Sequence, residues 1–301
     1  MSGVFFLRGL VSGFILVFNT LFWFVPIMLL AVIKVALPFN FIRVPINKTL
    51  DGFATVWITV NGFSQRLLGC SHLLVSGGGK LNLKGFYMVT ANHQSWVDIL
   101  ILQRVFNRQI PFIKFFLKQA LIWVPFIGLA WWALDFPFMK RYSQAQLKAR
   151  PELKGKDIEV TRKACEKYQY APVAIMNFLE GTRFTRLKHE QQGDGFQALL
   201  KPKAGGLSFA LTAMGGKLEQ LVDVTIVYPG GIPTMWDYLC GRVSQVKVHI
   251  RLLPISSDLL GDYQQDAEYR AKFQAWVNDL WKEKDHRIQL LTEGMGKVDH
   301  N

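Results

Sequence analysis

Cysteine is scarce in this chain of 301 residues, which contains only Cys70, Cys165 and Cys240. The three lie far apart, and no CxxC pair or His/Cys cluster surrounds any of them. Three isolated cysteines exclude a disulfide framework, and without neighbouring ligands they give no support to a structural zinc site. We therefore interpret the cysteines as small buried hydrophobic residues in a reducing compartment.

Charged residues are also few, and acidic residues are almost missing from the first half of the chain. Charged side chains make up 19% of the residues, below the roughly 25% of an average soluble domain. Residues 1–150 contain 3 Asp or Glu against 15 Lys or Arg, whereas residues 151–301 contain 19 against 20. The basic half is also the apolar half and has no Lys/Arg-rich run. Anionic lipid headgroups are therefore favoured over nucleic acid as its partners.

No charged residue occurs in the 23 residues from Val11 to Ile33. At about 1.5 Å per residue, a helix of this length spans a hydrocarbon core of about 30 Å. Only Arg8 precedes the segment and no small-x-small cleavage site closes it, so a membrane helix is favoured over a secretory signal peptide or a buried core helix. Because Lys34, Arg43 and Lys48 follow it, the positive-inside rule places the rest of the chain in the cytoplasm.

A second charge-free run, from Leu121 to Leu134, has only 14 residues and is too short to span a membrane. It contains three tryptophans and is flanked by basic residues on both sides. These features are typical of a surface that rests in the headgroup and acyl boundary of a bilayer. The alternative is a buried helix and strand of the protein core.

Beyond residue 50, short β-like runs alternate with helical segments. Half of the residues are hydrophobic, which excludes a disordered chain and allows a sizeable core. Residues 264–291 carry apolar side chains at spacings of three and four, as an amphipathic helix does. Strands interleaved with helices predict an α/β fold. The expected strands are residues 86–90, 110–114, 132–139, 172–178, 222–228 and 246–252.

Two polar segments follow predicted strands, which is where α/β proteins place their chemistry. In the first, His93 and Asp98 are five residues apart and would point about 140° apart on an ideal helix. They can meet if His93 lies in the strand-to-helix turn and Asp98 in the first helical turn, where a carboxylate also favours the macrodipole. A carboxylate that holds one imidazole nitrogen leaves the other as an oriented base, a role worth about 10² to 10⁴ in rate.

The second polar segment offers groups suited to phosphate. Gly181 and Thr182 at a strand end allow close backbone approach and offer N–H donors, and Arg183 supplies a guanidinium fork. Lys140 and Arg141, which follow another predicted strand, add positive charge. A base beside a phosphate clamp, next to a membrane-seeking surface, indicates a phosphorylated lipid whose hydroxyl is activated.

These two segments resemble motifs of the glycerolipid acyltransferases, the PlsC family that includes 1-acylglycerol-3-phosphate acyltransferase. His93 and Asp98 match the HX4D motif of that family, and residues 178–183 are similar to its FPEGTR motif. Leu179 stands where the family usually has proline, which loosens the turn but leaves the acidic and basic groups in place. Two ordered motifs are far more specific than either one alone.

The resemblance covers residues 85–235 and is most specific at two places. Residues 180–185 and 228–233 are similar to the lysocardiolipin acyltransferase-like branch and its bacterial YihG-type members. The resemblance implies a mixed, largely parallel sheet flanked by helices, with an N-terminal membrane helix. We accordingly expect a membrane anchor over residues 1–40 and an acyltransferase domain over 41–301, at the cytoplasmic face of a bacterial inner membrane.

A reaction is implied as well: transfer of a fatty acyl group from acyl-CoA or acyl carrier protein to the free hydroxyl of a lysophospholipid. The acceptor that this resemblance implies is 1-acyl-sn-glycerol-3-phosphate, which gives phosphatidic acid. No cofactor or metal is needed. His93 would remove the hydroxyl proton while Asp98 orients the imidazole. The residues that would bind the glycerol phosphate of the acceptor are Glu180, Gly181, Thr182 and Arg183, with Lys140 and Arg141 as helpers.

Two other classes of protein, a membrane adaptor and a lipid esterase, are alternatives to an acyltransferase. A non-catalytic membrane adaptor would keep the fold and bind lipid, but the intact pair of His93 and Asp98 argues against it. A lipid esterase would need a nucleophile elbow, and the nearest candidate is Ser208 in Gly-Leu-Ser-Phe-Ala, which has alanine in place of the last glycine.

Overall fold

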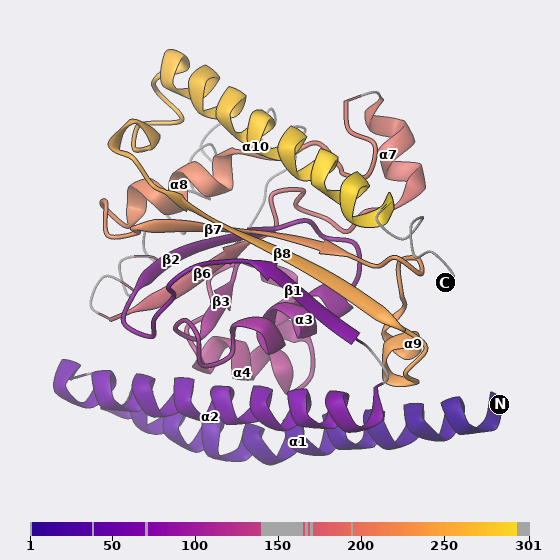
Figure 1. The fold of residues 1–301 in the computed structure, drawn as a ribbon. Helices are drawn as coiled ribbons and strands as arrows, with labels where there is room; N and C mark the ends of the chain where they lie inside the picture. The colour runs from indigo at the N-terminus through magenta and orange to yellow at the C-terminus, as the bar shows by residue number, and fades with distance from the viewer. Residues whose placement is uncertain are drawn as a thin grey trace.

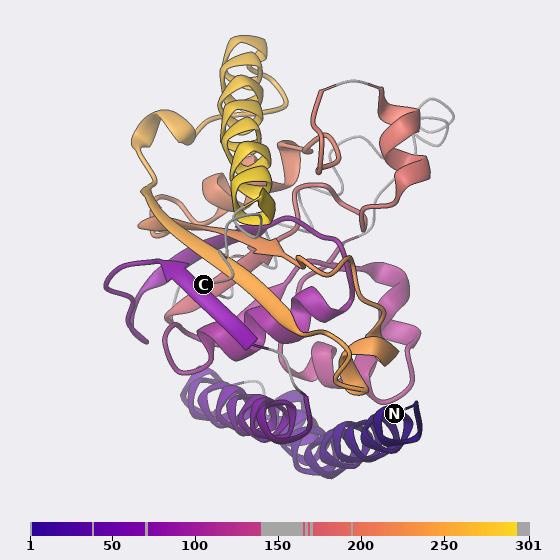
Figure 2. The same ribbon diagram turned by 45° about the vertical axis from the view of Figure 1, so that its right-hand side comes forward.

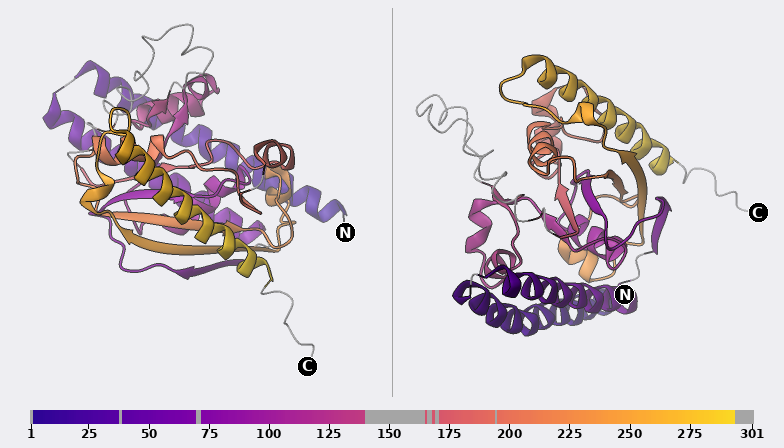
Figure 3. Two further views of the ribbon diagram at one scale, coloured as in Figure 1. Left: turned by 90° about the horizontal axis from the view of Figure 1, so that it is seen from above. Right: turned by 90° about the vertical axis from the view of Figure 1, so that its left-hand side faces the viewer.

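In the computed structural model of the chain, helices lie on both sides of one main sheet (Figure 1). Long helices lie at the two outer boundaries of the molecule, and the sheet lies between them (Figures 1 and 3). The residues that the structure describes are 2–37, 39–69, 72–139, 165, 168, 171–193 and 195–293.

The main sheet has six strands in the order β1-β8-β7-β2-β6-β3. All neighbouring pairs are parallel except β7 and β8, which are antiparallel. A mixed, largely parallel sheet was predicted and is confirmed. The strands of this sheet are β1 (His72–Gly77), β2 (Phe86–Ala91), β3 (Ile113–Phe115), β6 (Val173–Asn177), β7 (Gln220–Val227) and β8 (Gln245–Pro254). A separate parallel pair is formed by β4 (Leu117–Lys118) and β5 (Phe138–Met139).

The helices fall into three groups around the sheet. Two of them, α1 (Ser2–Ala36) and α2 (Asn40–Leu68), lie side by side along one side of the molecule (Figures 1 and 2). Two shorter helices, α3 (Val97–Phe106) and α4 (Ile127–Ala133), lie between this pair and the sheet. The 3-10 turn η1 (Gln119–Trp123) precedes α4 in the chain. The remaining helices are α7 (Arg186–Gln192), α8 (Gly205–Ala213), α9 (Met235–Leu239), η4 (Ser257–Leu259) and α10 (Ala267–Glu293).

Each face of the sheet has its own hydrophobic core, because successive side chains of a strand point to opposite faces. On β2, Val89 packs in the core that contains residues of α1 to α4. Its neighbour Met88 packs in the other core, which contains residues of α8 and α10. Both side chains are fully buried, so β2 is covered on both faces and reads as a continuous apolar run, as buried parallel strands do.

α1 is apolar throughout and exposes most of its large side chains. Within the part of the chain that the structure describes, it is the one helix long and apolar enough to cross a membrane, over Gly3–Ala36, in which an 18-residue window has a mean hydropathy of 2.3. The predicted segment from Val11 to Ile33 lies inside it. The exposed hydrophobic side chains of α1 include Val4, Leu7, Phe14, Phe18, Phe22, Val25, Leu29 and Val32.

The body of the protein contacts α1 near both of its ends. Close to the N-terminus, a Cβ added to Gly9 would lie 2.6 Å from Cys240 Sγ and 2.9 Å from the Trp236 ring, so only glycine permits this approach of α1 to α9. Near the C-terminus, Lys34 donates to the carbonyl of Ala133 at the end of α4 over 3.2 Å. About 38 Å of helix separates the two contacts at 1.5 Å per residue. α1 therefore lies along the body rather than projecting from it.

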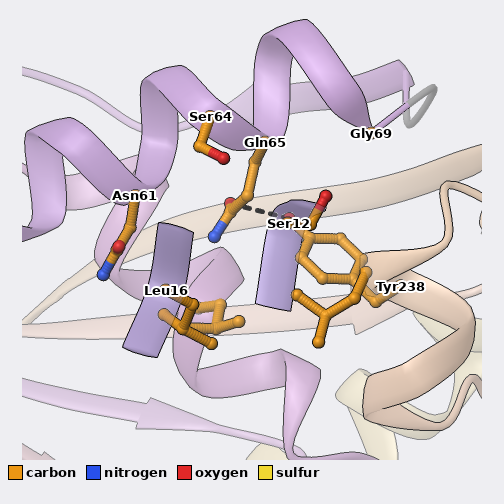
Figure 4. A pocket seen from close by; sticks show the side chains of 9 residues that line it. Ser12, Leu16, Asn61, Ser64, Gln65, Gly69 and Tyr238 are labelled. Carbon is orange, nitrogen blue, oxygen red and sulfur yellow. Dashed lines mark hydrogen bonds between the residues drawn. The ribbon is translucent and has the colours of Figure 1, made fainter. Parts of the chain in front are cut away.

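Polar side chains are enclosed between the two long helices and the body. Asn19 of α1 donates from Nδ2 to Asn61 Oδ1 of α2 over 2.8 Å. Next to this contact is a small pocket whose lining includes Ser12, and Tyr238 of α9 donates there to Gln65 Oε1 over 2.8 Å (Figure 4). Buried polar groups must find partners, so these bonds fix the register of α1 on α2 and of α2 on the body.

Ion pairs use every acidic residue of the acid-poor first half. Asp135, in the loop after α4, lies 2.5 Å from Lys34 Nζ, and Asp51 of α2 lies 3.1 Å from Lys114 Nζ of β3. The third acidic residue of the first 150 is Asp98, which belongs to the site described below. All three acidic side chains of this half therefore face a basic partner, with His93 as the partner of Asp98.

Four of the six predicted strands are present as β2, β6, β7 and β8, and the predicted C-terminal helix is α10. The strand expected at 110–114 is shorter and shifted, as β3. The strand expected at 132–139 was wrong: the segment begins inside α4, turns at Asp135 with φ 57°, and pairs only over Phe138–Met139. Neither β1 nor the long helix α2 was predicted from the sequence. The expected boundary near residue 40 falls between two helices that pack on each other.

Candidate active site

The two polar segments lie side by side because β2 and β6 are neighbouring parallel strands. Their register pairs Thr90 with Asn177, so both strands end at the same edge of the sheet and the turns that follow meet there. The Phe184 N–H donates to the carbonyl of His93 over 2.7 Å, which joins the two turns directly. β7 is the other neighbour of β2 and brings Tyr228 to the same edge.

The turn after β2 is held by a side chain that continues the strand pairing. Asn92 is fully buried. Its amide donates to the carbonyl of Ile226 and its Oδ1 accepts from the Ile226 N–H, both over 2.8 Å. This double contact extends the attachment of β2 to β7 beyond the last strand residue, and it fixes the backbone immediately before His93.

His93 and Asp98 meet across this turn. His93 Nδ1 lies 2.9 Å from Asp98 Oδ2. The same oxygen accepts from the backbone N–H of Gln94 over 2.6 Å and of Ser95 over 2.8 Å. Since α3 begins at Val97, the carboxylate sits in the first helical turn, where exposed N–H groups and the macrodipole favour negative charge.

The imidazole of His93 is fixed in plane and orientation. Phe178 stacks on it with ring centroids 3.9 Å apart and an angle of 13° between the planes. With Nδ1 facing Asp98, Nε2 points to the other side of the ring, and the side chain keeps 11% of its surface exposed. A carboxylate-held imidazole with its second nitrogen directed away is the arrangement of a general base.

Glu180 was expected to bind the acceptor, but its carboxylate is turned into the protein. The residue has no exposed surface. One oxygen accepts from the His93 N–H over 2.8 Å and the other from the Leu200 N–H over 3.1 Å. Burial raises the pKa of this carboxyl to about 8, although both backbone hydrogen bonds act to lower it. Glu180 therefore braces the His93 turn against the segment before α8 and presents no oxygen to a ligand.

The turn after Glu180 carries the other predicted phosphate ligands, and the N–H of Gly181 in it already donates to the carbonyl of Phe178 over 2.9 Å. Gly181 has φ 69°, a left-handed conformation that favours glycine. The guanidinium of Arg183 lies 4.6 Å from the centre of the Trp96 ring, within the range of a cation–π contact. Lys188 of α7 donates to Thr182 Oγ1 over 2.8 Å and to the carbonyl of Arg183 over 3.0 Å.

Three of these neighbours were not found from the sequence. Trp96 lies inside the first motif, but its position in the sequence does not predict a contact with Arg183. Lys188 lies outside the second motif, on the following short helix. Tyr228, whose hydroxyl donates to Asp98 Oδ1 over 2.6 Å, opens the segment 228–233 that the resemblance had marked without giving it a role.

Other predicted groups fall outside this site. Lys140 and Arg141 lie outside the described residues. Ser208, the nearest candidate for an esterase nucleophile, is fully buried inside α8, and its hydroxyl lies 3.1 Å from that of Tyr269. A nucleophile needs access to its substrate, so the described structure gives no support to the esterase alternative. Among the residues described, no group of three or more His, Cys, Asp or Glu side chains is arranged to hold a metal ion.

Comparisons with known proteins agree on one family. A family model described as Acyltransferase matches residues 72–229, more than half of the chain. The 1-acyl-sn-glycerol-3-phosphate acyltransferase gamma of Homo sapiens is 25% identical over 189 residues, which cover 60% of this chain and 46% of that protein. Lysocardiolipin acyltransferase 1 of Danio rerio is 25% identical over 260 residues, which cover 81% of this chain and 62% of that protein. The chain thus matches about half the length of these curated relatives.

A solved structure has the same fold. The crystal structure of the 1-acyl-sn-glycerophosphate acyltransferase PlsC from Thermotoga maritima aligns with a TM-score of 0.50 and 17% sequence identity. The alignment covers 93% of this chain and 97% of the other. It therefore includes the long N-terminal helices as well as the sheet.

Proposed function

Because the chain belongs to the acyltransferase family, we propose that it moves a fatty acyl group from a thioester donor to the free hydroxyl of a lysophospholipid at a membrane. The observation that carries the proposal is the His93–Asp98 pair, joined over 2.9 Å at the sheet edge beside the turn that holds Arg183. Acyl-CoA or acyl carrier protein supplies the thioester, and no further cofactor is required.

The geometry supports a direct transfer. Nε2 of His93 takes the proton of the acceptor hydroxyl as its oxygen attacks the thioester carbonyl carbon. The carbon–sulfur bond then breaks, and the proton passes from the imidazole to the leaving thiolate. The products are an oxygen ester and a free thiol. Asp98 holds the Nδ1 proton throughout, which orients the ring and stabilises the imidazolium while it exists.

For the acceptor we propose 1-acyl-sn-glycerol-3-phosphate, which would become phosphatidic acid. Arg183 and Thr182 are assigned to its phosphate, since a guanidinium fork and a hydroxyl suit a phosphate group. Gly181, whose N–H donates to the carbonyl of Phe178, gives the turn the left-handed conformation that it needs. Lys140 and Arg141 stay proposed helpers. Glu180 is reassigned from the acceptor to the support of the His93 turn, because both of its oxygens are used by backbone N–H groups.

The proposed place of action is the cytoplasmic face of a bacterial inner membrane. Three observations support attachment through α1 and α2: the exposed apolar side chains of α1, the exposed Phe41, Val44 and Phe63 of α2, and the exposed Trp123 of η1. The excess of basic over acidic residues in this half of the chain adds attraction to anionic headgroups, worth about 1 kcal/mol for each Lys or Arg near the surface.

The proposal is tested with the purified full-length protein in mixed micelles. Release of free thiol from acyl-CoA is measured with lysophosphatidic acid, lysocardiolipin and a monoacylglycerol that lacks phosphate. We expect thiol release that depends on the acceptor and that is nearly abolished in His93→Ala, since loss of a general base costs about 10² to 10⁴ in rate. Normal turnover in His93→Ala would overturn the mechanism. Binding of lysolipid without turnover by the wild type would favour the membrane adaptor.

A further inference from the structure

The two oxygens of Asp98 have different partners. Oδ2 accepts from His93 Nδ1 and from the two backbone N–H groups of the turn. Oδ1 accepts from the hydroxyl of Tyr228 over 2.6 Å. Asp98 has no exposed surface, so water does not replace a missing donor easily. A buried carboxylate oxygen deprived of its donor is costly, by more than an ordinary hydrogen bond is worth.

We propose that Tyr228 is a positioning residue of the catalytic pair: its hydroxyl holds the second oxygen of Asp98 and thereby sets the orientation and the basicity of His93. This rests on the proposed function, because it assigns a role in the same reaction. Tyr228 touches neither the imidazole nor, in the proposed reaction, the substrate, and it acts through Asp98 alone.

Tyr228 is itself held firmly. It directly follows β7 and is 6% exposed. Its carbonyl accepts from the N–H of Gly231 in a turn, and five residues after it the carbonyl of Pro233 accepts from Ser95 Oγ over 2.6 Å. The segment 228–233 is therefore fastened to the His93 turn at both of its ends. Burial, followed by the neighbouring Asp98 charge, raises the pKa of Tyr228 well above its usual value, so the phenol keeps its proton and remains a donor.

The sign of the expected effect follows from the charges that face the pair. Asp98 contacts His93 from α3, Tyr228 approaches Asp98 from β7, and Glu180 contacts the His93 backbone from the turn after β6. Further away, Lys284 of α10 acts on Glu180 through Coulomb forces. Tyr238 of α9 is the weakest influence on Tyr228, and it is a neutral phenol near neutral pH because burial raises its pKa. A donor on Asp98 Oδ1 reduces the proton affinity of the carboxylate. Its removal strengthens the pull of Asp98 on the imidazole and raises the pKa of His93.

The test compares Tyr228→Phe with Tyr238→Phe. Both substitutions delete one hydroxyl from a buried tyrosine, but Tyr238 donates to Gln65 at the α9–α2 boundary and has no contact with Asp98. Two quantities are measured for each variant. The first is kcat/KM for acyl transfer as a function of pH. The second is the titration of His93 by NMR of 13C-labelled histidine, with its signal among the six histidines assigned by its loss in His93→Gln.

For Tyr228→Phe we expect kcat/KM near neutral pH to fall by about tenfold or more, the effect of one hydrogen bond to a charged group. The acid limb of its pH profile and the NMR pKa of His93 should both move to higher pH. Tyr238→Phe should leave both where they are in the wild type. Its loss of thermal stability serves as the reference for deleting a buried hydroxyl.

Three results would overturn the proposal. An unchanged His93 titration in folded Tyr228→Phe would do so, whatever the activity. An equal shift in Tyr238→Phe would show that the effect belongs to any buried hydroxyl. A downward shift would contradict the assigned charge effect. If the wild type shows no acyl transfer, the proposed function fails, while the NMR titration still decides the role of Tyr228.

Discussion

The ammonium of Lys34 in α1 lies 2.5 Å from a carboxylate oxygen of Asp135, 101 residues later in the chain. Both side chains are largely buried, with exposed fractions of 9% and 15%. The contact joins the end of the apolar helix to the loop that follows α4. Two charges that share so little water are costly to separate.

We therefore expect Lys34→Met to lower the free energy of unfolding by about 3 kcal/mol, because it leaves the Asp135 carboxylate buried without its ammonium. The double variant Lys34→Met/Asp135→Asn should recover much of that loss. Thermal or denaturant unfolding in micelles measures both. The exposed pair of Lys272 and Glu268, at 74% and 78%, is the matched control, and its removal should cost far less, because water screens exposed charges. Equal losses at the two sites would contradict the assigned burial.

Glu180 predicts a pH dependence of stability. Burial raises its pKa from 4.5 to about 8, so the folded protein binds more protons at this site than the unfolded chain between these two values. Stability from this group is therefore fully present below about pH 4.5 and is lost as the pH rises through about 8. The melting temperature of the wild type, relative to that of Glu180→Gln, should fall as the pH rises across this window, because glutamine does not ionise. A difference that does not change with pH would contradict the assigned burial effect.

Arg183 predicts a change in acceptor binding rather than in the chemical step. Arg183→Ala should raise the KM for lysophosphatidic acid by an amount equal to one charge-assisted contact, roughly 1.5 to 3 kcal/mol, and leave the KM for acyl-CoA nearly unchanged. Arg183→Lys should restore only part of it, because a lysine cannot form the bidentate fork. Steady-state kinetics with each substrate varied in turn distinguish the two. A change confined to the donor would move Arg183 to the thioester.

Replacement of Asp98 should also lower the rate of acyl transfer, as replacement of His93 does. Asp98→Asn keeps the size of the side chain but loses the charge that stabilises the imidazolium, so acyl transfer should fall strongly while lysolipid binding is kept. Binding is measured by equilibrium partition into lysolipid micelles and turnover by thiol release. Loss of both together would indicate a collapsed turn rather than lost catalysis.

The apolar face of α1 predicts where the membrane is bound. Phe14 and Phe18 are 70% and 60% exposed, and replacing both by Asp should release a large part of the protein from membranes in an alkaline carbonate wash, because charges are costly in lipid. The control is Leu290, which is 55% exposed on α10, the helix at the boundary of the molecule opposite α1. The variant Leu290→Asp should stay bound to membranes. The remaining binding should fall as salt rises, since exposed charges are screened within about 10 Å at 0.1 M.

A second experiment tests on which side of the membrane the residues beyond α1 lie. A reporter that is active only in the periplasm, fused to the C-terminus, should be inactive if residues beyond α1 stay in the cytoplasm. Activity of that fusion would contradict the proposed location without affecting the prediction for Phe14 and Phe18.

The central strands were predictable from the sequence because buried parallel strands are continuous apolar runs. The meeting of His93 with Asp98 was also within reach, since both belong to one local turn. The direction of Glu180 was not, because residue type shows that a carboxylate is present but not which side of the turn it faces. Tyr228 was still further out of reach: its contact with Asp98 joins residues 130 positions apart, and no local pattern encodes such a pairing.

The segment at 132–139 illustrates a different difficulty. Its tryptophans and alanines suit either a strand or a helix over a few residues. Contact of α4 with α1 decides for the helix, so tertiary packing overrides local preference there. The long helix α2 was missed for a related reason, since its buried face contains the polar Asn61 and Ser64 as well as apolar residues.

The two contacts that hold α1 against the body also set an order of events during synthesis. Lys34 cannot form its ion pair until Asp135 has been synthesised, and Gly9 cannot pack on α9 until Trp236 and Cys240 have been synthesised. At about 5 to 20 residues per second, roughly 10 to 40 s pass between the emergence of α1 and that of its last partner. Asp135 emerges before Trp236 and Cys240, so the contact at the C-terminal end of α1 can form while the one at its N-terminal end is still incomplete. If α1 binds lipid as proposed, the nascent chain is already at the bilayer when β8 completes the sheet that carries His93.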